Sequence, residues 1–60
     1  MTYVFILAIR EEWDEPIVES FVAPDEDSAY MMFYKETDFT SEEIEEGELK
    51  GEIKLIVKCY

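Results

Sequence analysis

The chain has 60 residues, with 16 acidic against 5 basic side chains and a formal net charge of −11 at pH 7. Because 48% of the residues are hydrophobic and 15% are aromatic, the chain is too apolar for a disordered protein, and we expect one domain over residues 1–60. The sequence contains no histidine, which excludes Ser-His-Asp and Cys-His catalysis and removes the commonest metal ligand. A chain this short buries only about 60% of its unfolded surface, so self-association or a partner is an expected source of stability.

The first third of the sequence predicts a β-hairpin. Residues 3–10 are rich in β-branched and aromatic side chains and are apolar on both faces, a pattern typical of a central strand. Residues 11–15 form a polar connection that ends at Pro16, which is tolerated at the first residue of a strand. Residues 17–22 then predict a second strand, and Glu19 interrupts its apolar character as in an edge strand.

A helix is predicted from residue 26 to about residue 36. Asp25 is the expected N-cap, because three consecutive carboxylates at 25–27 suit the unpaired N–H groups and the dipole of a helix N-terminus. Tyr30 and Tyr34 are expected to flank the buried face, and Met31 to point toward solvent or a partner. The residues expected to face the sheet are Ala29, Met32 and Phe33.

Residues 40–52 allow two readings. Thr40 and Glu43 have the spacing of a capping box, which predicts a short helix over residues 41–46 stopped by Gly47. The same stretch could instead form a loop. Gly47 and Gly51 bracket a predicted turn before a last strand over residues 52–60, whose apolar side chains alternate.

These elements predict an α+β fold: a small ββαβ domain with a three-stranded antiparallel sheet of order 2-1-3 and one helix packed on one face. One helix cannot cover both faces of the sheet. The uncovered face holds either Val4, Ile6, Ala8 and Ile56 or their neighbours by alternation, and an apolar patch of this kind usually marks an interface. We therefore expect a homodimer formed through this face or through a strand edge.

No catalytic, cofactor or metal site is predicted. Exposed carboxylate pairs on turns lack the burial that would adapt their pKa values for catalysis, so we expect a protein that is not an enzyme. Asp25 and Asp27 have an alternating spacing, but Tyr30 occupies the position where a calcium-binding EF-hand loop requires glycine. The single cysteine, Cys59, cannot form an intrachain disulfide and fits a reducing compartment.

The distribution of negative charge carries the functional hypothesis. Fifteen of the sixteen acids are expected outside strand interiors, where they can gather on the surface. Carboxylates at i, i+3 or i+4 of a helix lie about 5 to 6 Å apart, a spacing of the order of phosphate repeats, so such an array can compete for the Lys and Arg groups that bind nucleic acid. Trp13 is either folded over the core or displayed as an interface anchor. The predicted partner-binding residues are Glu11, Glu12, Trp13, Asp14, Glu15, Glu36, Asp38, Glu42, Glu43, Glu45, Glu46 and Glu48.

In its length, its charge and its lack of catalytic groups, the chain resembles the small acidic inhibitors encoded by phages and other mobile elements. These include DNA mimics that block nucleases, glycosylases, polymerases or defence complexes. The stretch from Phe21 to Ala29 also resembles the strand-to-helix junction of short phage ββαβ proteins. The resemblance implies an inhibitor or decoy that acts in the cytoplasm of a host cell on a basic, nucleic-acid-handling protein.

We therefore expect a soluble cytoplasmic protein that binds a basic protein partner and neither nucleic acid nor membrane directly. The alternatives are a surface whose charge serves solubility alone, and a small homodimeric structural or regulatory adaptor that binds a protein partner through its sheet face or edge.

Overall fold

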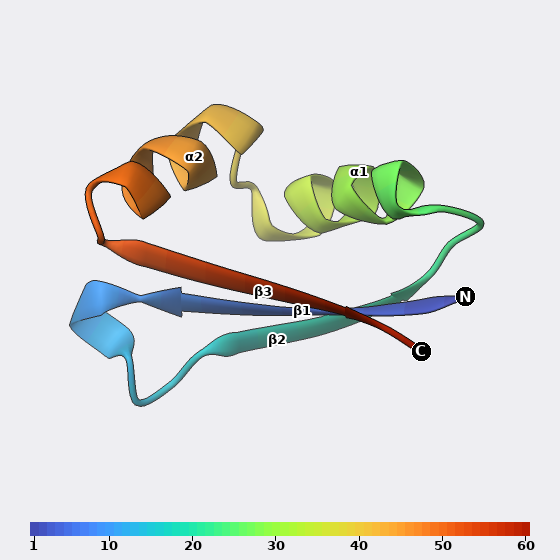
Figure 1. Cartoon of the computed structure of the whole chain (residues 1–60), viewed down its shortest axis with the longest axis horizontal. Helices are drawn as coiled ribbons and strands as arrows, with labels where there is room; N and C mark the ends of the chain where they lie inside the picture. The colour runs from blue at the N-terminus through green and yellow to red at the C-terminus, as the bar shows by residue number, and fades with distance from the viewer.

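The computed structural model describes residues 1–60. The strands are β1 (Thr2–Ile9), β2 (Ile17–Val22) and β3 (Ile53–Cys59), the helices are α1 (Glu26–Thr37) and α2 (Ser41–Leu49), and a short 3-10 helix, η1 (Arg10–Glu12), follows β1. The strands form one antiparallel sheet of order β2-β1-β3, which confirms the predicted α+β class and strand order. Both helices lie on the same side of the sheet (Figure 1).

The core lies between the helices and one face of the sheet. Tyr3, Phe5 and Leu7 of the central strand are buried on this face. Phe5 is at the centre: its ring stacks on Phe33 of α1 at a centroid distance of 4.6 Å and meets Tyr30 edge-on at 5.0 Å. The sequence could not decide which face of this strand the helices cover, because both faces are apolar, and the aromatic side chains of β1 and α1 decide it by packing together.

Helix α1 begins where the sequence predicts. The Asp25 carboxylate accepts a hydrogen bond of 2.8 Å from the Ser28 backbone N–H, and this bond holds the pKa of Asp25 below its usual value. The predicted buried face is wrong at Met32, which is 40% exposed, whereas Ala29 and Phe33 are buried as expected. The helix is rotated so that Tyr30 and Tyr34 pack against the core in place of Met32, because Tyr30 contacts Phe5 and thereby buries a larger apolar surface.

The prediction of a single helix is wrong, because α2 is a second helix of nine residues. Thr40 is its N-cap and accepts a hydrogen bond of 3.2 Å from the Glu43 N–H, as the spacing predicted. Gly47 does not stop this helix, which continues to Leu49. The glycine lies against β3, where an added Cβ would be 2.6 Å from Cγ1 of Ile53. It is therefore a point of close packing between α2 and β3, and the turn falls at Gly51, which has a φ of 71°.

The sheet face away from the helices is covered by no other element (Figure 1). We call it the open sheet face. Alternation along the strands and the pairing register place the following residues on it: Thr2, Val4, Ile6, Ala8, Val18, Ser20, Val22, Lys54, Ile56 and Lys58. Val18 and Ile56, which flank Ile6 on either side, are 57% and 51% exposed.

Candidate protein-binding surface

Helix α2 carries the densest negative charge in the molecule. Five of its nine residues are glutamates, and all five are exposed. We call them the α2 carboxylates: Glu42, Glu43, Glu45, Glu46 and Glu48. The helix can display them because Ile44 and Gly47 are its buried residues, so its remaining surface is free to face solvent.

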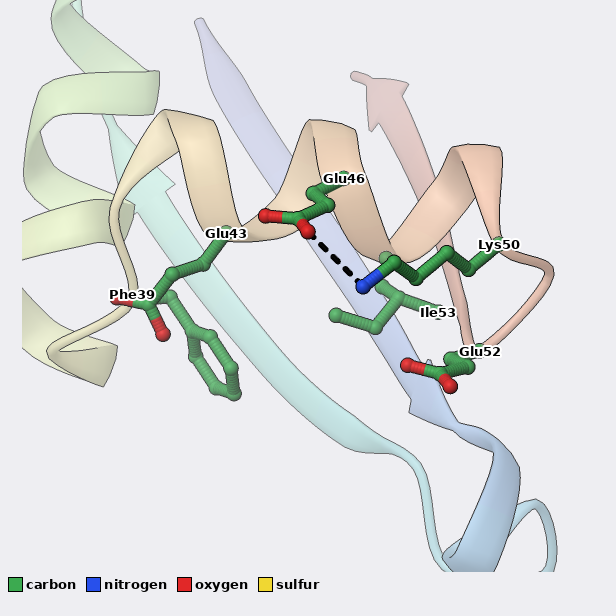
Figure 2. Close-up of a pocket in the computed structure, with 7 residues that line it drawn as sticks. Phe39, Glu43, Glu46, Lys50, Glu52 and Ile53 are labelled. Atoms are coloured by element: carbon green, nitrogen blue, oxygen red, sulfur yellow. Dashed lines mark ion pairs between the residues drawn. The ribbon is translucent and has the colours of Figure 1, made fainter.

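A shallow hollow of about 260 Å³ lies beside α2 and is lined by Glu43, Glu46, Lys50 and Glu52 together with Phe39, Gly47 and Ile53 (Figure 2). On the α2 side of this hollow, Lys50 Nζ lies 2.9 Å from Glu46 Oε1 one helical turn earlier, and this is the single salt bridge of the molecule. The hydrogen bond and the charge of Lys50 lower the pKa of Glu46, and those of Glu46 raise the pKa of Lys50. The other α2 carboxylates therefore have no ion-pair partner.

Glu52 connects this hollow to a second one. It also lines a smaller hollow of about 160 Å³ with Ile9, Arg10 and Glu11. The two hollows are neighbours because the end of β1 pairs with the start of β3, with the Arg10 N–H donating to the Glu52 carbonyl at 2.8 Å. Carboxylates thus continue from α2 across the end of the sheet to η1, with Arg10 and Lys50 as the cations among them.

The acidic connection between β1 and β2 lies on the opposite side of the sheet from the helices (Figure 1). Glu12, Asp14 and Glu15 are exposed there. Trp13 is 40% exposed, and Lys54 Nζ of the open sheet face lies 5.2 Å from its ring centroid. The tryptophan is thus neither folded into the core between helices and sheet nor fully displayed, since it borders the open sheet face through a cation–π contact.

Two further predicted residues lie at the C-terminal end of α1. Glu36 lies in its last turn and Asp38 caps it in the left-handed conformation, with a φ of 61°, and both are exposed. Glu48 belongs to α2 and is exposed. Burial is the main cause of the raised pKa values of Tyr30 and Tyr34, and the negative charge of Glu48 raises both pKa values further.

The predicted residues therefore form two groups. The α2 carboxylates, Glu36, Asp38 and Glu11 lie on or next to the helix side, whereas Glu12, Trp13, Asp14 and Glu15 lie toward the open sheet face. Sequence reasoning missed Glu52, Arg10 and Lys50 as members of the surface. Only the pairing of β1 with β3 brings Glu52 beside Glu11, and the sequence does not specify that register.

The arrangement suits electrostatic contact with a protein surface. Both hollows are shallow and lined mainly by charged side chains, unlike the enclosed, apolar pockets that hold small molecules. No cluster of three acidic or cysteine side chains is placed to hold a metal ion. Neither helix combines the length and apolar character that crossing a membrane requires.

Comparison of the chain with protein-family models, with curated proteins and with solved structures found no match.

Proposed function

We propose that this protein is a non-enzymatic acidic binding protein that occupies the basic, nucleic-acid-binding surface of a protein partner and so inhibits or decoys it. The observation that carries the proposal is the density of unpaired charge on α2, where four of five glutamates lack an ion-pair partner. A surface of this kind offers acceptors to the Lys and Arg side chains that otherwise contact phosphates.

The packing of α2 supports this proposal. The helix is fixed on the sheet through Ile44, Gly47 and the close contact of the glycine with Ile53. Its carboxylates are therefore held on a rigid element, which reduces the entropy lost when they bind. A net charge of −11 also exceeds the magnitude of about 2 to 8 that solubility asks of a small domain.

The negative charge is distributed unequally between the two sides of the sheet. No acidic side chain belongs to the open sheet face, whose two charged residues are Lys54 and Lys58. Most carboxylates lie on the helix side or at the end of the sheet, and the exceptions are Glu12, Asp14 and Glu15 in the connection between β1 and β2. A basic partner is therefore attracted to the helix side, and its rate of association increases through steering between opposite charges.

The test is affinity capture from a cell lysate on the immobilised protein, with two matched triple variants. The first, Glu42→Gln, Glu43→Gln and Glu45→Gln, removes three charges from α2 and keeps the capping box, which accepts Gln in place of Glu. The control, Glu19→Gln, Glu26→Gln and Asp27→Asn, removes three charges from β2 and α1. Each variant neutralises two first-turn acids of one helix, so the effects on net charge and on helix dipoles match.

We expect the wild type and the control to capture the same nucleic-acid-handling protein and the α2 variant to lose most of it. The affinity of the wild type for that protein should fall at least about tenfold as salt increases from roughly 0.1 M to 1 M, where the Debye length shrinks from about 10 to 3 Å. If the two variants lose the captured protein to the same extent, net charge alone causes the binding and α2 has no specific role. Affinity that does not change with salt would contradict the proposal.

A further inference from the structure

The central strand has the composition of a strand that is covered on both faces. Antiparallel sheets with one solvated face usually alternate apolar and polar residues, but β1 places Val4, Ile6 and Ala8 on the open sheet face. Val18 and Ile56 extend this apolar row to both neighbouring strands, since Ile6 pairs with each of them. The row crosses the middle of the sheet, where its side chains have no partner in the chain.

The chain exposes somewhat more surface than its mass predicts. The chain exposes 4444 Å², whereas a monomer of 7.1 kDa is expected to expose about 4,100 Å². The open sheet face itself spans about 330 Å², for three strands of seven residues spaced by 4.8 Å with a rise of 3.3 Å.

We propose that a second copy of this chain covers the open sheet face, in a face-to-face dimer whose two helix layers point outward. The charges of this face favour a second copy in one orientation. A two-fold axis perpendicular to the strands would place Lys54 over the partner's Lys58, which is repulsive. An axis parallel to β1 instead places β3 of each chain over β2 of the other.

The parallel axis pairs apolar residues along the middle row of the face and keeps the lysines of the two copies apart. Ile6 lies on the partner's Ile6 and Ile56 on the partner's Val18, because the three residues share one row of the register. Lys58 then lies over the partner's Ser20, since both pair with Val4, and Lys54 lies level with the partner's Pro16, where the acidic connection between β1 and β2 ends. The contact is isologous and therefore closes after two copies.

The dimer is weak and its assembly depends on concentration. Two faces of this size bury roughly 700 Å² in total, below the 1,200 Å² or more of stable interfaces, so a dissociation constant between about 1 μM and 1 mM is expected. Salt strengthens the dimer, because it screens the repulsion between two chains of charge −11. The proposed complex with a basic partner has the opposite salt dependence, so the two proposals fail independently.

Sedimentation velocity of the full chain from about 10 μM to about 1 mM tests the dimer. The weight-average mass of the wild-type protein should rise well above 7.1 kDa at the upper end of this range. Val18→Lys should weaken assembly at least about tenfold. Met31→Lys is the matched control: Met31 is a 72% exposed apolar residue of α1, the charge change is identical, and assembly should be unaffected.

Methyl chemical shifts of the wild type provide a second readout that does not depend on the folding of a variant. Dilution should shift the methyl signals of Ile6, Val18 and Ile56 and leave Met31 and Leu49, on the helix side, unchanged. A chain that stays monomeric at about 1 mM would overturn the proposal. Equal weakening by the two lysine substitutions, or concentration-dependent shifts at Met31 and Leu49, would overturn it as well.

Discussion

At the scale of single residues, the tyrosines against the core link stability to alkaline pH. Burial raises the pKa values of Tyr3, Tyr30 and Tyr34 above 10.0. The folded chain therefore holds these protons more tightly than the unfolded chain. This contribution to stability is complete below pH 10 and is lost as pH rises through the raised pKa values.

Tyr30→Phe should reduce the loss of stability above pH 10. The substitution keeps the ring that meets Phe5 edge-on and removes the ionisable hydroxyl, so the two chains should have similar melting temperatures at pH 7. Thermal melts at pH values from 9 to 11.5 should show a shallower decline for the variant. Lys50, whose pKa is raised by Glu46, titrates in both chains and cancels in the comparison. Parallel declines would show that Tyr30 ionises equally well in the folded state.

At the scale of elements, Gly47 controls the close packing of α2 against β3. Gly47→Ala should destabilise the protein by about 1–3 kcal/mol, the usual cost of overpacking, although alanine favours helix formation by about 1 kcal/mol over glycine. The cost exceeds the gain because the new methyl group lies 3.0 Å from Cβ of Ile53, which no change of rotamer moves, and because relief of its contacts with Cγ1 and Cδ1 requires Ile53 to leave its packed rotamer.

Chemical denaturation of Gly47→Ala and of Glu45→Ala measures this effect. Glu45 is an exposed residue of the same helix, so its replacement by alanine should change the free energy of unfolding by less than about 0.5 kcal/mol. Unchanged or increased stability of Gly47→Ala would mean that α2 does not lie as close to β3 as the structure places it.

The elements that the sequence predicted correctly are those set by local chemistry. The strand over residues 17–22 follows from Pro16 and β-branched side chains, and the starts of both helices follow from Asp25 and Thr40, whose caps act over three residues. Gly47 was interpreted wrongly because a glycine that ends a helix and one that permits close packing look alike in sequence. The distinction depends on Ile53, which is distant until β3 joins the sheet.

The candidate surface was also predictable only where local sequence determines it. The density of glutamates on residues 42–48 is visible in the sequence, and so is their exposure once Ile44 is recognised as the buried residue of α2. The division of the predicted residues between the two sides of the sheet was not predictable. It depends on the direction in which the connection after β1 leaves the sheet, which no local pattern specifies.

At the scale of the whole molecule, self-repulsion opposes folding. Eleven excess negative charges on a chain with one salt bridge destabilise the compact state, and salt screens them. The melting temperature should therefore rise with added NaCl, by about 4–8 °C for each kcal/mol gained. The scan belongs at protein concentrations below those at which sedimentation detects any dimer. A melting temperature that falls or stays constant would show that repulsion is a minor cost.

The central claim is that the carboxylate surface takes the place of nucleic acid on its partner. The most direct measurement is competitive elution: proteins captured from a lysate on the immobilised chain are released at low salt by a short DNA or RNA duplex, and identified by mass spectrometry. The account predicts that the duplex releases the same protein that raised salt releases and that the Glu42→Gln, Glu43→Gln, Glu45→Gln variant fails to capture. A partner that salt releases but that neither duplex can displace would contradict it.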